Sequence, residues 1–234
     1  DVVNIEEGKV LKQELTDKVL ASFQGDGLDF FFLLFQSKRS FRLRLDLSTI
    51  KWFYDFDLNQ YYQSHPENII LPKNSDVQLM NIIEPESLYV ELDTKSTKKV
   101  PVRSQIVTAL EAGYTKYEMN IDPDSVTISG PSSFLNEINY INTEKIVQKN
   151  VTSNINLTVA LQSFGEKNIS IEPNKVEIKQ EIDQIGEKVI SGVPITIKNQ
   201  PKTGQIEIYP NKVTVYISGG FNKIKNIGID DLNV

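Results

Sequence analysis

Residues 171–178 read IEPNKVEI and residues 83–90 read IEPESLYV, so a proline, two further residues and an alternating strand pattern recur after about 88 residues. A second pair recurs at nearly the same period, IDPDSVTI at 121–128 and IYPNKVTV at 208–215. Two such units in each period argue against chance similarity. The sequence therefore predicts a chain of small, repeated modules.

Apolar and polar residues alternate with a period of two through the repeated segments. Residues 155–161 show this most clearly, and 41–47, 88–92, 193–197 and 213–217 follow the same rule. Alternation places the apolar side chains on one face of a strand and leaves the other face in water, which favours antiparallel pairing. We therefore predict a mainly β fold with short helical turns, arranged as an elongated tandem array of small antiparallel β modules.

The predicted helices are short and follow glycines. Apolar residues at helical spacing occur in 134–138, after Gly130, and in 221–227, after Gly219 and Gly220. The run FFFLLF at 30–35 occupies the corresponding place in the first module, where a helix is favoured over a buried strand.

The repeat also predicts the module boundaries. A divergent first module spans 1–94, a second module spans 95–184, and a partial third module spans 185–234. The polar stretch 93–98 is typical of a linker between the first two modules. We expect the native protein to continue beyond Val234, and we expect a signal or membrane anchor before Asp1, because the chain does not begin with methionine.

Composition argues against several classes of function. The net charge of -6 and the pI near 5.0 disfavour nucleic-acid binding, which normally requires clustered Lys and Arg. The chain has no cysteine and a single histidine, His65, so disulfides, cysteine-ligated zinc and most nucleophile–base pairs are excluded. We predict a protein that is not an enzyme and that needs no metal or cofactor.

Aromatic residues are most concentrated between positions 52 and 62. Trp52, Tyr54, Tyr61 and Tyr62 are the candidate interface residues, although in a small module with few large side chains the pattern more simply predicts that these aromatics build the core. Asp55 and Asp57 alternate within the same stretch. Paired carboxylates can bind calcium or hydrolyse glycosides, but the pattern more simply predicts the wet face of a strand.

The second module resembles the YbbR-like domain family. The resemblance rests on KKVPV at 98–102, GY at 113–114, IDPDSVTISGP at 121–131, TE at 143–144, and the closing strand from 171 to 182. The first module is similar to the family more loosely, through LDLS at 45–48 and the strand that follows Glu84 and Pro85.

This resemblance implies a membrane-anchored protein with several modules on the outer side of the cytoplasmic membrane. Relatives in one branch of the family regulate a membrane-bound diadenylate cyclase, which makes cyclic di-AMP, so the implied function is that of a scaffold or regulator of a membrane protein partner. The resemblance supplies no residue of a regulatory interface. One alternative is a module that binds cell-envelope glycans through the aromatics around Trp52. Another is an RNA-binding β module, which the acidic charge disfavours.

Overall fold

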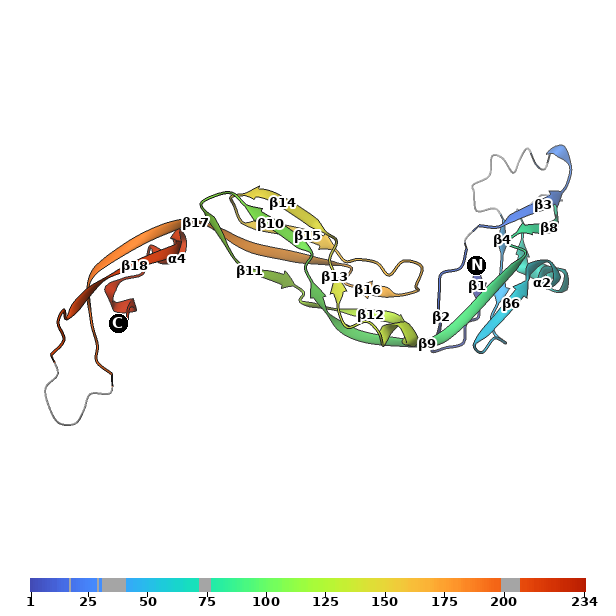
Figure 1. Cartoon of the computed structure of the whole chain (residues 1–234). Helices are drawn as coiled ribbons and strands as arrows, with labels where there is room; N and C mark the ends of the chain where they lie inside the picture. Colours follow the sequence, from blue (N-terminus) through green and yellow to red (C-terminus); the bar gives the residue numbers. More distant parts are fainter. Residues whose placement is uncertain (17, 29, 31–40, 72–76, 199–206) are drawn as a thin grey trace. The chain divides into compact units, whose positions relative to one another are not determined.

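The computed structural model describes residues 1–16, 18–28, 30, 41–71, 77–198 and 207–234 (Figure 1). It confirms a mainly β fold with short helices and several small antiparallel sheets. The choice between helix and strand at 31–35 lies outside the described residues. The chain divides into two compact units, one of Asp1–Val100, Val126–Asn139 and Ser163–Glu172, the other of Pro101–Ser125, Tyr140–Gln162 and Pro173–Val234. The three-module boundaries stay a prediction.

The first unit is built around the long strand β9. Its strands are β1 (Val2–Val3), β2 (Lys9–Leu11), β3 (Leu20–Gln24), β4 (Arg42–Leu43), β5 (Leu45–Asp46), β6 (Phe53–Asp57), β7 (Ile69–Ile70), β8 (Gln78–Glu84), β9 (Ser87–Arg103), β12 (Ser125–Pro131) and β16 (Ser170–Glu172). Strand β9 pairs with β2, β6 and β12, and β12 also pairs with β16. The remaining pairs are β3 with β8, β4 with β7, and β1 with β5, the last of these parallel.

The core of this unit gathers side chains from β2, β5, β6, β8 and β9. Its buried members are Leu11, Leu45, Leu47, Phe56, Leu58, Tyr62, Ile82, Val90 and Leu92. Strand β6 runs antiparallel to β9, and in this register Phe56 faces Leu88 and Tyr54 faces Val90. Alternation then turns Phe53, Asp55 and Tyr89 toward the opposite, exposed face.

Helix α2 (Leu58–Ser64) follows β6 directly and was not predicted. Asp57 ends the strand and caps the helix, because its carboxylate accepts a hydrogen bond from the Gln60 backbone N–H at 2.9 Å. Leu58 and Tyr62 are buried four positions apart, on one face of the helix. A helical reading of the aromatic segment could have been found from this spacing after a capping aspartate.

The second unit is built around β17 (Lys175–Pro194). Its other elements are β10 (Ile106–Leu110), β11 (Tyr114–Asp122), β13 (Ile141–Asn142), β14 (Ile146–Val151), β15 (Ile155–Ala160), β18 (Lys212–Gly220) and helix α4 (Phe221–Ile224). Strand β17 pairs antiparallel with β11, β15 and β18. Ile178 lies between Leu157 and Ile121 in register and is fully buried, which confirms the alternation predicted for these strands.

Two strand pairs of the second unit differ from the predicted antiparallel pattern. Strand β10 pairs with β14, and β13 pairs with the end of β9, and both pairs are parallel. Parallel neighbours need a crossover connection rather than a tight hairpin. The segment between β10 and β14 supplies one, since it contains β11, β12 and helix α3 (Ser132–Leu135).

The repeated prolines lie at corners where the chain changes sheets. Pro85 lies between β8 and β9, Pro123 between β11 and β12, and Pro173 between β16 and β17. The two strands at each corner do not pair with each other in the described part of the chain. Proline suits such a corner because it lacks a backbone donor and restrains the preceding residue to extended geometry.

The prediction of a linker at 93–98 is wrong. These residues lie inside β9, and the boundary predicted near 184 lies inside β17, which continues to Pro194 (Figure 1). Strand pairing carries β17 through this point, because β11 pairs with it as far as Gln184 and β18 pairs with it from Ile185.

Candidate functional site

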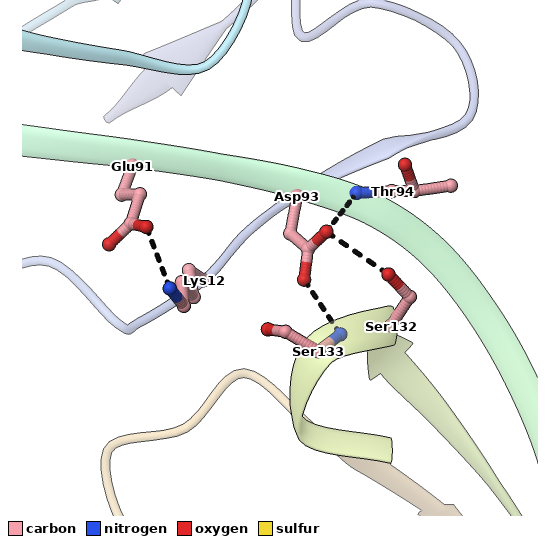
Figure 2. A network of polar contacts seen from close by, with 6 residues as sticks. All are labelled: Lys12, Glu91, Asp93, Thr94, Ser132 and Ser133. Carbon is pink, nitrogen blue, oxygen red and sulfur yellow. Dashed lines mark hydrogen bonds and ion pairs between the residues drawn. The ribbon is translucent and has the colours of Figure 1, made fainter. Parts of the chain in front are cut away.

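The polar residues of β9 mistaken for a linker hold the start of helix α3. The Asp93 carboxylate accepts hydrogen bonds from the Ser133 backbone N–H at 2.9 Å and from the Ser132 hydroxyl at 3.1 Å, and also from the Thr94 backbone N–H at 2.7 Å (Figure 2). The first backbone N–H groups of a helix have no partner within the helix, so a carboxylate placed there stabilises it. Asp93 thus acts as a cap supplied by a distant strand.

The same strand also holds the end of this helix. The Lys98 ammonium donates to the Leu135 carbonyl at 3.1 Å and to the Ile138 carbonyl at 2.6 Å. The Leu135 carbonyl also accepts from the Ile138 backbone N–H at 3.2 Å, and a cation beside the last carbonyl groups of a helix is favourable. We call this arrangement of Asp93, Lys98 and α3 the first joint.

A cation completes the first joint from the neighbouring strand. The Lys12 ammonium lies 2.7 Å from the Glu91 carboxylate, and it also lies 5.7 Å from the centre of the Phe134 ring, on α3 (Figure 2 shows the ion pair). The hydrogen bond with Glu91 raises the pKa of Lys12 above its ordinary value. Lys167 lies 4.5 Å from the centre of the same ring, so two cations lie near Phe134.

The second unit contains a second joint with the same plan. Asp183 of β17 accepts from the Asn222 backbone N–H at 2.8 Å and from the Asn222 side-chain amide at 3.0 Å, at the start of α4. Lys188 donates to the Lys225 carbonyl at 2.6 Å, at the end of the helix. Residues 91–98 read ELDTKSTK and residues 181–188 read EIDQIGEK, so both joints use the pattern Glu, aliphatic, Asp, four residues, Lys.

The cation and the aromatic ring exchange places between the two joints. Asp93 pairs in register with Val10, two residues before Lys12, and Asp183 pairs with Thr115, two residues before Tyr117. On the helix side, Phe134 and Lys223 each occupy the third helical position. The Lys223 ammonium lies 3.5 Å from the centre of the Tyr117 ring, so a cation–π contact occurs in both joints with its partners reversed.

Tyr117 lies close against the second joint. Its hydroxyl oxygen is buried and has no hydrogen-bond partner among the described residues. A Cβ added to Gly220 would collide with this hydroxyl and lie 2.7 Å from an Asp183 carboxylate oxygen. Burial, and then the nearby Asp183 carboxylate, raise the pKa of Tyr117. The glycine at position 220 is therefore required by a close approach of side chains.

The candidate interface residues separate into two exposed and two inward-facing side chains. Trp52 is 57% exposed and Tyr54 is 50% exposed. Tyr61 is partly buried, and its hydroxyl accepts from the Asp46 backbone N–H at 2.9 Å. Tyr62 is only 4% exposed and belongs to the core, so its assignment to an interface is corrected. The alternative reading of these aromatics as core holds for Tyr62, because α2 turns it inward.

Two further exposed aromatics lie beside Trp52 and Tyr54. Phe53 is 66% exposed, and its ring centre lies 6.3 Å from that of Tyr89 on β9, which is 56% exposed. The Lys9 ammonium lies 4.8 Å from the Trp52 ring centre. Sequence reasoning missed Tyr89, because only the pairing of β6 with β9 brings it to this cluster.

The carboxylates of β6 lie on its wet face, as the alternation predicted. Asp55 and Asp57 are both exposed, and Asp57 is engaged as the cap of α2. Within the described residues, no three Asp, Glu or His side chains lie close enough to hold a metal ion. His65 is exposed and its ring stacks on Tyr61, with ring centres 4.8 Å apart.

Comparison with known proteins places the middle of the chain in a family. A family model described as YbbR-like protein matches residues 100–180. This segment is a YbbR-like domain. It supplies α3 to the first joint, whereas Asp93 and Lys98 lie just before the matched residues and Asp183 and Lys188 just after them.

Two solved structures are similar to the chain. One is the crystal structure of a YbbR-like protein from Streptococcus pneumoniae TIGR4, with 14% identity, a TM-score of 0.47, and coverage of 79% of this chain and 90% of that one. The other is the solution structure of SuR18C from Streptococcus thermophilus, with 22% identity, a TM-score of 0.33, and coverage of 38% and 86% respectively. No curated protein matches the chain. Among the described helices, none is long and apolar enough to cross a bilayer.

Proposed function

We propose that this protein is a non-enzymatic, extracytoplasmic scaffold of tandem YbbR-like modules that regulates a membrane protein partner, with a diadenylate cyclase as the candidate partner. In this proposal the protein is held at the membrane by an N-terminal anchor that precedes Asp1. The family of residues 100–180 supports the module type. The partner and the location are carried over from what the resemblance implies.

The observation that carries the scaffold role is the pair of joints. In each, a carboxylate and an ammonium of one long strand hold the two ends of a short helix, through Asp93 and Lys98 and again through Asp183 and Lys188. These hydrogen bonds are partly or fully exposed to water, so each contributes on the order of 1 kcal/mol. These charged side chains are occupied in fixing the fold within each unit, which supports a structural rather than a catalytic role for them.

Crosslinking in the native cells tests this proposal. The full-length protein in its membrane is crosslinked, and bound proteins are identified by mass spectrometry. We expect a membrane protein, and a diadenylate cyclase in the most informative case. Tyr216→Ala, at a 78% exposed position of β18, serves as a matched surface control for Asp183→Ala, which should reduce recovery of the partner. Recovery of no membrane protein contradicts the proposal.

Glycan binding is a second candidate, favoured by the exposed rings of Trp52 and Tyr54. Exposed aromatic faces can stack on sugar rings. Trp52 is the sole tryptophan, so its emission reports directly on this surface. Titration with envelope oligosaccharides should quench it if this candidate is correct, and unchanged emission contradicts it.

A further inference from the structure

Strand β6 is an edge strand with unused hydrogen-bonding groups. The Trp52 carbonyl accepts from the Leu92 N–H at 2.6 Å, and the Leu58 N–H donates to the Glu86 carbonyl at 3.0 Å. In an antiparallel pair the bonded positions alternate, so Tyr54 and Phe56 also turn their backbone groups toward β9. The N–H and C=O groups of Phe53 and Asp55 therefore point away from β9, and in the described part of the chain no strand pairs with that edge.

An exposed strand edge of this kind favours pairing with another strand. Proteins commonly block such edges with charge, proline or a covering loop, because unpaired N–H and C=O groups recruit other chains. Here the edge carries Trp52, Phe53 and Tyr54, each at least half exposed. Large aromatic side chains on an accessible edge supply apolar area for an interface.

The residue order along this edge is complementary to itself. Residues 51–55 read Lys, Trp, Phe, Tyr, Asp, with a cation at one end, an anion at the other and aromatics between them. Two copies placed antiparallel with Phe53 at the centre bring Lys51 opposite Asp55 twice, Trp52 opposite Tyr54 twice, and Phe53 opposite itself. Lys51 and Asp55 are both exposed, and neither side chain has an ion-pair partner among the described residues.

We propose that β6 pairs with β6 of a second copy of this chain, in an antiparallel register centred on Phe53. A two-fold interface must be self-complementary, and this order of charges and rings meets that condition. The outward backbone groups of Phe53 fit the central position, where two residues exchange both of their hydrogen bonds. Tyr89 extends the contact, because it stacks on Phe53 on the same face.

The competing register is disfavoured by charge. The other outward-facing residue of β6 is Asp55, and a pair centred there would place two Asp55 carboxylates opposite each other. Like charges directly opposite across strands are destabilising. The sequence therefore selects the register centred on Phe53.

A charge exchange tests this interface on the full chain. Sedimentation velocity over a wide concentration range, at about 0.15 M salt to screen long-range charge, should show a monomer–dimer equilibrium. Asp55→Lys places two lysines opposite each other twice, and we expect the dissociation constant to rise on the order of tenfold, since opposed pairs contribute roughly 0.2–1 kcal/mol each. The double variant Lys51→Asp with Asp55→Lys restores the opposite charges and should restore the dimer. Asp122→Lys, at an exposed position of β11 in the second unit, is the matched control.

A second experiment tests the register. Because the chain has no cysteine, Lys51→Cys and Asp55→Cys variants can be crosslinked with a short bismaleimide, alone or mixed. The mixture should crosslink faster than either variant alone.

A chain that stays monomeric at every concentration, a double variant that fails to dimerise, or a mixture that crosslinks no faster overturns the proposal. Quenching of Trp52 by envelope oligosaccharides in a monomeric chain would do so too, and would assign this edge to glycan. The dimer is independent of the scaffold role, so crosslinking to a membrane partner is not affected by its failure.

Discussion

Replacing Asp93 by alanine removes the acceptor that fixes the start of α3. The variant loses the bonds from the Ser133 N–H at 2.9 Å, the Ser132 hydroxyl at 3.1 Å and the Thr94 N–H at 2.7 Å. Removing a side-chain acceptor from a helix start costs about 0.5–2 kcal/mol. Asp93 is only partly buried, so water compensates some of the loss, and a local cost near the middle of that range, about 1.4 kcal/mol, follows.

Amide hydrogen exchange at Ser133 measures this cost where it arises. Because 1.4 kcal/mol corresponds to a factor of ten in an equilibrium constant, we expect the Ser133 amide of Asp93→Ala to exchange about tenfold faster. Asp55→Ala is the matched control, since Asp55 lies on the wet face of the same sheet and has no hydrogen-bond partner among the described side chains. It should leave exchange at Ser133 unchanged.

The pH dependence gives a second, independent measurement. Burial by itself would raise the pKa of Asp93. Hydrogen bonds from Ser133, Thr94 and Ser132 together lower the pKa by more than burial raises it, so the pKa lies below its ordinary value. A carboxyl whose pKa is lower in the folded state stabilises that state above its unfolded pKa, about 3.9, and loses this contribution as the pH falls through the folded pKa. Protection of Ser133 should therefore decline in acid in the wild type and stay level in Asp93→Ala. Equal protection of the Ser133 amide in both proteins at neutral pH would refute the role of Asp93 as the cap of α3.

Three further predictions concern packing and ionisation. Gly220→Ala should lower the free energy of unfolding by about 1–3 kcal/mol in urea titrations, because the new methyl group meets Tyr117 and Asp183, and adding Tyr117→Phe should relieve part of the loss. Burial raises the pKa of Tyr62, so wild-type stability should fall as the pH rises above about 10, and Tyr62→Phe should lose less over the same range in alkaline unfolding. Leu47→Ala, at a fully buried position, should cost about 2–5 kcal/mol in urea unfolding followed by circular dichroism.

The strands and the repeated helices could be predicted because their signals are local. Alternation in 155–161 and 175–182 depends on one buried face, and the structure confirms it through Val159, Val176 and Ile178, all nearly inaccessible to solvent. The helices after Gly130 and Gly219 were also predicted, because the apolar residues that follow these glycines are spaced as in one turn of helix. The parallel pairing of some strands was not predicted, because it depends on the crossover connection and not on the residue pattern within any one strand.

The joints could not be recognised because their residues serve distant partners. Residues 93–98 carry only polar side chains, and a strand whose polar groups bind a helix some 40 residues later has the same composition as a linker. Comparison of 91–98 with 181–188 contains the missing signal. Aligned on the aspartates, both segments place Glu two residues before and Lys five residues after. Tyr62 was misassigned for a related reason, since its burial depends on a helix that the aromatic pattern concealed.

The exchange of cation and ring between the joints separates what the fold requires from what it tolerates. In both joints the aspartate uses its two carboxylate oxygens to accept two hydrogen bonds from the first turn of the helix. Lys98 and Lys188 each donate to a carbonyl after the helix end. The third contact needs only one cation and one ring, and the attraction is the same whichever element supplies each. Lys12 with Phe134 and Tyr117 with Lys223 are therefore equivalent solutions. Sequence identity at these positions is lost between repeats while the contact persists.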